Sequence, residues 1–158
     1  MAVLRVARWA CRARRALALF LVVFIGIQFV RPDRTNPPTP PAGSLLRKTP
    51  PEVTAVLERS CRDCHSNETR WQWYSYVAPA SWLVVGDTNR GREHFNFSEW
   101  TSYTSDEQDK FLGAMCNLTQ RGRMPKWQYL LVHQGAKLSA ADVKALCAWS
   151  DKMRDTLH

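Results

Sequence analysis

The hydrophobic pattern changes along the chain. Residues 16–30, ALALFLVVFIGIQFV, carry no charge and have no polar face, whereas apolar positions farther on recur at intervals of three and four. Such intervals predict amphipathic helices. We expect one helix from Thr49 through Pro50 and Pro51 towards Cys61, one from Ser105 to Gly122, and one from Ser139 to Leu157. No alternating apolar run is long enough for a sheet, so the sequence predicts an all-α fold.

The first thirty-one residues have the layout of a membrane-targeting segment. The apolar stretch lies between Arg15 and Arg31, and four more arginines precede it. A positive region before an apolar core is typical of a secretory signal or a signal anchor. No small-x-small cleavage site follows, so we interpret residues 1–31 as an uncleaved transmembrane anchor, with secretion after cleavage as the alternative. Fifteen residues are short for a span of about 20, but flanking arginines can snorkel.

The arginines also predict an orientation. Positive charge stays on the cytoplasmic side, which places the rest of the chain outside the cytoplasmic membrane, facing the periplasm. Residues 32–51 hold seven of the nine prolines. Proline fixes φ and removes an amide donor, so this segment is expected to be an extended linker. The domain proper is then expected over residues 52–158.

Net charge initially suggests an anionic partner. The 158 residues carry a formal charge of +8, but six arginines and no acidic residue lie in residues 1–31. The remaining chain has 16 basic and 14 acidic residues. A nearly neutral domain does not have the basic surface of a nucleic-acid-binding protein. We therefore expect no nucleic-acid partner.

The sequence Cys61-Arg62-Asp63-Cys64-His65 is a C-x-x-C-H motif. Each thiol can add to a vinyl group of haem, and the spacing of one helical turn matches the spacing of the two vinyls. The histidine that follows is carried beneath the iron, where it serves as proximal ligand. The motif predicts one covalently attached haem c, with Cys61 and Cys64 as thioether residues and His65 on the iron.

Two other sites could use the same residues. A structural zinc site needs four ligands, and the chain has no second C-x-x-C or H-x-x-H pair to complete Cys61, Cys64 and His65. A thiol redox pair is typical of a βαβ context, whereas the pattern around Cys61 is helical. Both alternatives are weaker than haem attachment.

The sixth iron position has three main candidates. Met124 follows a predicted helix stop at Gly122 and precedes Pro125, which favours an extended and stiff backbone at Met124. We expect Met124 to be the ligand, with His94 and His133 as alternatives. Met115 and Met153 fall on predicted apolar helix faces and are assigned to the core.

Further segments resemble one protein family. They are residues 64–71 (CHSNETRW), 79–83 (PASWL), 91–100 (GREHFNFSEW) and 124–129 (MPKWQY) with His133. Together with C-x-x-C-H, they resemble the haem-binding-domain family of small c-type cytochrome-like proteins. The resemblance covers about residues 50–149. It implies a small cytochrome c-like helical domain around one haem, and supplies no physiological reaction. Cys116 and Cys147 are not part of this signature.

Ligation decides the expected chemistry. With His65 and Met124 both bound, the iron is saturated and one-electron transfer is the remaining activity, so we expect a membrane-tethered electron carrier with redox partner proteins rather than an enzyme. An open sixth position would instead support peroxidase or gas-sensing activity. Arg92, Arg121 and Arg123 are expected either to pair with haem propionates or to be solvated. Cys116 and Cys147 either form a disulfide or pack as small apolar side chains.

Overall fold

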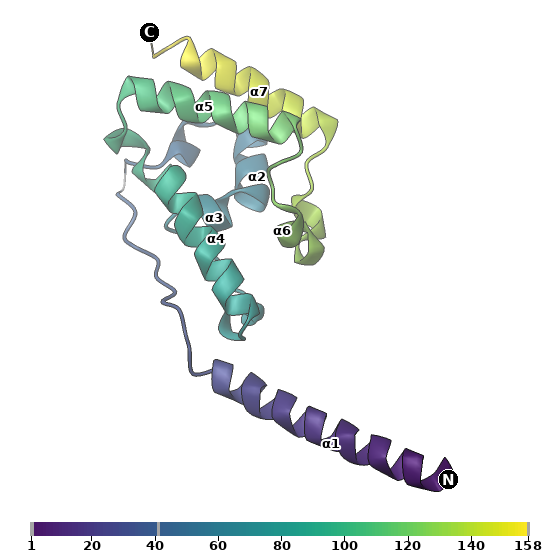
Figure 1. Cartoon of the computed structure of the whole chain (residues 1–158). Coiled ribbons are helices and arrows are strands. Elements are labelled where there is room, and N and C mark those ends of the chain that lie inside the picture. Colours follow the sequence, from purple (N-terminus) through teal and green to yellow (C-terminus); the bar gives the residue numbers. More distant parts are fainter. Residues whose placement is uncertain (1, 41, 158) are drawn as a thin grey trace. The chain divides into compact units, whose positions relative to one another are not determined.

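The computed structural model describes residues 2–40 and 42–157, with side chains from residue 9 onward. Every regular element in these residues is a helix, which confirms the predicted all-α class. The α-helices are α1 (Ala2–Ile27), α2 (Pro51–Ser60), α3 (Arg62–His65), α4 (Ala80–His94), α5 (Ser105–Gln120), α6 (Trp127–Val132) and α7 (Ala140–Arg154) (Figure 1). Short 3-10 helices cover Leu45–Lys48 (η1), Trp73–Tyr76 (η2), Phe97–Ser102 (η3) and Gln134–Ala136 (η4).

The helices belong to two compact units. The first unit comprises Met1–Arg34 and Trp71–Gly86, and the second comprises Thr35–Arg70 and Asp87–His158. The continuous helix α4 contributes residues to both units. All residues of the C-x-x-C-H motif, and Met124, lie in the second unit.

The predicted helix starts agree with the structure to within about two residues. Helix α7 begins with a capping box, in which Ser139 accepts from the backbone of Asp142 and Asp142 accepts from that of Ser139. Helix α5 starts at the predicted Ser105 and uses Thr104 and Glu107 as its capping box. Helix α2 has Pro51 as its first residue, where the missing amide hydrogen has no intrahelical acceptor to lose.

Two helices were not expected from the pattern. Helix α4 and helix α6 fall in segments whose apolar residues show no clear helical period. Helix α4 contains Gly91 and several polar residues, and none of the residues of α6 is buried. A helix with weak amphipathicity gives little periodic signal, so the pattern alone could not reveal it.

The predicted transmembrane anchor is not supported. Residues 2–27 do form helix α1, but no helix in the described chain is long and apolar enough to cross a membrane. The helix ends at Ile27, before the apolar stretch ends, and its charge-free part begins only after Arg15.

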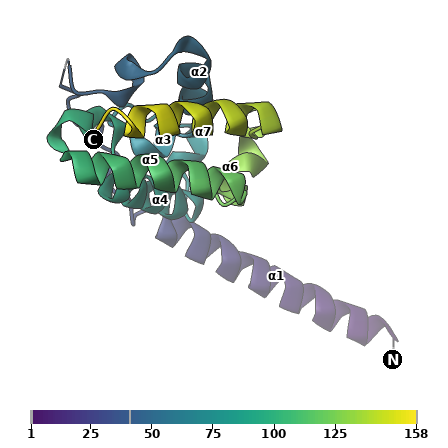
Figure 2. The ribbon, with the colours of Figure 1, turned by 90° about the horizontal axis from the view of Figure 1, so that it is seen from above.

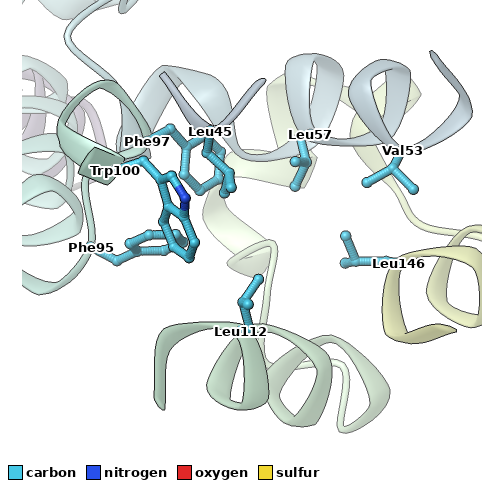
Figure 3. Packing of buried hydrophobic residues seen from close by; sticks show 8 residues of the cluster. All are labelled: Leu45, Val53, Leu57, Phe95, Phe97, Trp100, Leu112 and Leu146. Carbon is cyan, nitrogen blue, oxygen red and sulfur yellow. The ribbon is translucent and has the colours of Figure 1, made fainter. Parts of the chain in front are cut away.

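The core of the second unit is built from α2, α5, α7 and the aromatic segment that follows α4. Helices α5 and α7 run side by side (Figure 2) and are joined by a disulfide between Cys116 and Cys147. The buried side chains converge as shown in Figure 3: Leu45, Val53, Leu57, Phe95, Phe97, Trp100, Leu112 and Leu146. Met115 and Met153 pack against this cluster, in agreement with their predicted core role.

The proline-rich segment differs from the expected free linker. Leu45, within the predicted linker, is fully buried in the core. Upstream, the Asn36 side chain donates to the Thr69 carbonyl at 2.9 Å, and the Thr39 hydroxyl is 3.3 Å from that of Ser98. Polyproline segments leave their carbonyls unpaired, and Pro38 uses one of them to accept from Asn67. The second unit therefore begins well before residue 52.

Candidate functional site

The C-x-x-C-H motif lies where α2 ends and α3 begins. Cys61 is the C-cap of α2 and the N-cap of the single turn of α3, which carries Cys64 and His65. The backbone amides of Cys64 and His65 both donate to the carbonyl of Cys61, at 3.2 and 3.0 Å. The three residues therefore lie on one tight turn, which keeps the two sulfurs and the imidazole close in the chain.

Helix α4 approaches this turn very closely. A Cβ atom added at Gly91 would lie 2.3 Å from the backbone oxygen of Cys64. Any other residue at this position would collide with the motif backbone, so glycine is required by the packing. Gly91 thereby allows the end of α4 and the Phe95 backbone to reach His65.

The imidazole of His65 is held by one nitrogen. Its Nδ1 lies 2.9 Å from the carbonyl oxygen of Phe95. Because a carbonyl can only accept, Nδ1 carries the proton and donates, and the lone pair of the neutral ring is on Nε2. Burial lowers the pKa of His65, which favours the neutral ring. The Phe97 ring stacks against the imidazole with centroids 5.8 Å apart.

The two motif thiols are free, and their surroundings favour the protonated form. Neither is in a disulfide. Burial raises the pKa of Cys61 to about 12, with a smaller contribution from Cys64. Burial also raises the pKa of Cys64 to about 11, together with the negative charges of Asp63 and Asp87. A raised thiol pKa lowers the fraction of thiolate, which is the form that attacks a disulfide.

Asp63, between the two cysteines, is a buried carboxylate with a full set of partners. Its Oδ2 accepts from the Tyr129 hydroxyl at 3.0 Å, and its Oδ1 accepts from the backbone and side chain of Arg70. Its backbone carbonyl accepts from the Thr69 hydroxyl at 2.7 Å. Sequence reasoning did not single out Asp63 or Tyr129, because an x position of the motif carries no chemical signal of its own.

Met124 lies on a loop that is fixed at both ends. Helix α5 ends in a Schellman motif, in which Gly122 (φ 64°) donates to Thr119 and Arg123 donates to Leu118. The Met124 amide also donates to Leu118, at 3.3 Å. On the far side, Lys126 bonds Asp87 of α4 at 2.8 Å and Tyr129 bonds Asp63. The loop with Met124 is thus attached to the elements that surround the motif, and the Met124 side chain is half-buried.

The alternative sixth ligands have different surroundings. His133 caps the C-terminus of α6, where its Nδ1 donates to the Tyr129 carbonyl at 3.1 Å and its ring stacks on Tyr129 with centroids 4.0 Å apart. His94 is the last residue of α4 and is exposed. The contacts of His133 are those of a helix-terminal structural residue.

The three arginines that are expected either to pair with haem propionates or to be solvated have different surroundings. Arg92 donates to the Ser66 and Thr35 carbonyls at 2.8 Å each, and to Asn36 and Thr69 side chains at 3.0 and 2.7 Å. Its guanidinium therefore clamps the loop after the motif to the start of the second unit. Arg121 and Arg123 are exposed.

The residues present fit a haem. In the described chain, two buried side-chain polar atoms have no hydrogen-bond partner, Ser60 Oγ and Arg62 Nε, and these residues flank Cys61. A buried donor without a partner is costly, and a carboxylate group of a bound cofactor would satisfy it. The described residues contain no cluster of three or more His, Cys, Asp or Glu side chains that could hold a metal ion.

The comparison with protein families agrees with this site. A family model described as a haem-binding domain matches residues 22–152. The chain belongs to the haem-binding domain family. The match includes parts of both compact units and begins within α1, upstream of the boundary at residue 52 that the sequence pattern predicts. The chain matches no curated protein and no solved structure significantly. Membership supports a haem cofactor for the C-x-x-C-H site.

Proposed function

We propose that this haem protein is an exported c-type cytochrome-like electron carrier with one haem attached through Cys61 and Cys64. His65 and Met124 are the proposed axial ligands. The observation that carries the proposal is the state of His65: the Phe95 carbonyl holds Nδ1, and the Nε2 lone pair is available on a neutral ring beside two free thiols. This arrangement is typical of an imidazole whose orientation and basicity are set for an iron.

When bound, the haem supplies a reversible one-electron couple, and a neutral methionine sulfur favours its reduced form. The chain's own residues provide attachment, orientation and burial. Gly91 and the Phe95 carbonyl fix the His65 side of the site. The Asp63–Tyr129 and Lys126–Asp87 contacts fix the segment that follows Met124. Two rigidly held ligands favour electron transfer to redox partner proteins over exchange with small molecules.

We also propose that the N-terminal segment directs export across the cytoplasmic membrane and that the domain works on the outer side of that membrane. The disulfide between Cys116 and Cys147 supports this location, because such bonds persist in oxidising compartments. Arginines followed by an apolar stretch are typical of an export signal.

The test replaces the proposed sulfur ligand with a side chain of similar size. Met124→Leu in protein matured in a host that attaches haem c should abolish the methionine–iron charge-transfer band and lower the reduction potential. Met115→Leu, in a methionine that packs against the core, is the matched control and should change neither. The sixth-ligand assignment is wrong if the band persists in Met124→Leu and is lost instead in His94→Ala or His133→Ala.

The same protein preparation also distinguishes electron transfer from the alternative function, peroxidase or gas-sensing activity. Rapid binding of carbon monoxide to the reduced wild-type protein would indicate an open sixth position and favour peroxidase or gas-sensing activity over electron transfer.

A further inference from the structure

Large apolar side chains are exposed in the first compact unit, in η2 and the residues that follow it. Trp73 is 75% exposed, Tyr76 55% and Leu83 46%, and Val77 and Trp82 are also exposed. We name these five residues the aromatic collar. Exposed tryptophan, tyrosine and aliphatic side chains gathered within residues 73–83 are typical of an interaction surface.

The aromatic collar is attached to the end of helix α1. Gln28 is the one polar residue in residues 16–30, and its amide both donates to the Ala78 carbonyl at 3.1 Å and accepts from the Ala78 amide at 2.9 Å. The Trp82 indole donates to the Val30 carbonyl at 2.7 Å. These bonds hold the collar at the C-terminal end of an apolar helix whose side chains are themselves exposed.

Positive charge is concentrated in the same unit of the chain. Met1–Arg34 and Trp71–Gly86 together contain seven arginines and one acidic residue, Asp33. Arg34 lies over the Tyr76 ring, 4.2 Å from its centroid, and donates to the Ser75 carbonyl. The rest of the chain has 15 basic and 13 acidic residues, so the charge is concentrated in the unit that carries the collar.

We propose that the aromatic collar and helix α1 form one docking surface for a bilayer that contains anionic lipid. Tryptophan and tyrosine rings occupy the headgroup region of membranes, and arginines attract the anionic headgroups around them. The charge-free part of α1, residues 16–27, is about 18 Å long, and arginines lie beyond both of its ends. The apolar side chains of this helix can enter the bilayer interface while the arginines beyond its ends stay among the headgroups. The proposed location outside the cytoplasm decides which face of the membrane this surface would bind. Binding to the bilayer itself does not depend on that location.

The test compares two exposed tryptophans in the same full-length holoprotein. Trp73 belongs to the collar, and Trp127 of α6, in the second unit, is 67% exposed and serves as the internal control. Hydroxyl-radical oxidation followed by mass spectrometry should modify both at comparable rates in solution. With vesicles of phosphatidylcholine and phosphatidylglycerol, oxidation of Trp73 should fall at least several-fold and that of Trp127 should not change.

Substitution provides a second readout. Trp73→Ser with Leu83→Ser should weaken partition to the same vesicles about tenfold or more, because two apolar side chains no longer enter the interface. Trp127→Ser should leave partition unchanged. The proposal is overturned if vesicles do not protect Trp73, if Trp73 is already protected in vesicle-free holoprotein, or if the chain binds native membranes but not pure lipid. The last result would indicate a membrane protein as partner. Loss of the Met124 spectral band leaves these measurements unaffected, so the two proposals fail independently.

Discussion

Two pairs of cysteines in the second unit have opposite states. Cys116 and Cys147 are 31 residues apart in sequence, yet α5 and α7 bring their Cα atoms to 4.9 Å and they form a disulfide. Cys61 and Cys64 are three residues apart and remain free. The difference shows that helix packing, rather than proximity in the chain, selects the disulfide. The motif thiols, held on one turn beside His65, are left for another reaction.

The largest expected effect comes from removing the free pair. Cys61→Ala with Cys64→Ala should abolish covalent haem attachment, because no thioether can form, and each single change should reduce it. Haem staining after denaturing electrophoresis measures the result. Cys11→Ala, in an exposed free cysteine outside the motif, is the control and should stain like wild type. Full staining of the double variant would contradict the assignment of the motif.

Removing the other pair should affect stability and leave attachment intact. Cys116→Ser with Cys147→Ser should lower the free energy of unfolding by about 2–4 kcal/mol, since a cross-link over a loop of this size restricts the unfolded chain. Urea denaturation measures the change, and haem staining should stay at the wild-type level. An unchanged unfolding midpoint would mean that the disulfide contributes nothing to the fold.

The packing against the free pair can be tested at one glycine. Gly91→Ala should cost about 1–3 kcal/mol of stability and reduce haem attachment, because the new methyl group collides with the Cys64 carbonyl. Gly135→Ala is the matched control, since a Cβ there meets no atom within 4 Å. Both variants are measured by denaturation and by the haem content of the purified protein. Equal effects of the two substitutions would contradict the close approach of α4.

The smallest effect concerns an ion pair between α2, which ends at Cys61, and α7, which carries Cys147. Arg59 of α2 bonds Asp142, which lies in the first turn of α7. This contact, together with the hydrogen bonds from Ser139, lowers the pKa of Asp142 to about 2. A carboxyl group whose pKa is lower in the folded than in the unfolded protein stabilises the fold at pH values above its unfolded-state pKa. This contribution is lost as the pH falls through the folded-state pKa. Asp142→Asn should therefore cost about 1 kcal/mol at neutral pH, through the weakened capping box and the lost ion pair.

The difference in stability between the wild type and Asp142→Asn should decrease between about pH 4 and pH 2, where the wild-type carboxyl gains its proton. Thermal unfolding of both proteins across this range measures it. Asp151→Asn is the control, because Asp151 is an exposed acidic residue of the same helix. A difference that stays constant down to pH 2 would mean that the charge of Asp142 is not responsible.

Much of the fold followed from local patterns. The helices that start at Pro51, Ser105 and Ala140 have apolar periodicity and capping residues, and both kinds of signal are local. Helices α4 and α6 lack a clear apolar period, and their role lies in contacts such as Gly91 with Cys64 and Tyr129 with Asp63. These contacts join residues 27 and 66 positions apart, which no local pattern encodes.

In the candidate site too, some features can be predicted from local sequence and others depend on contacts between distant residues. The C-x-x-C-H motif is local, so its residue types alone indicate haem attachment. The carbonyl of Phe95 that holds His65 is a backbone group, and any residue could supply it. The docked segment around Leu45 was missed because its prolines indicate extended structure and do not show whether that structure packs on a core.

The most direct test of the central claim is the absorption spectrum of the full-length protein matured in a host that attaches haem c, oxidised and reduced, with and without carbon monoxide. We expect one haem that stays with the chain after acid–acetone extraction, a methionine–iron band in the oxidised state, and a reduced spectrum unchanged by carbon monoxide. Haem that is extracted from the chain, or a reduced spectrum that carbon monoxide shifts at once, would contradict it.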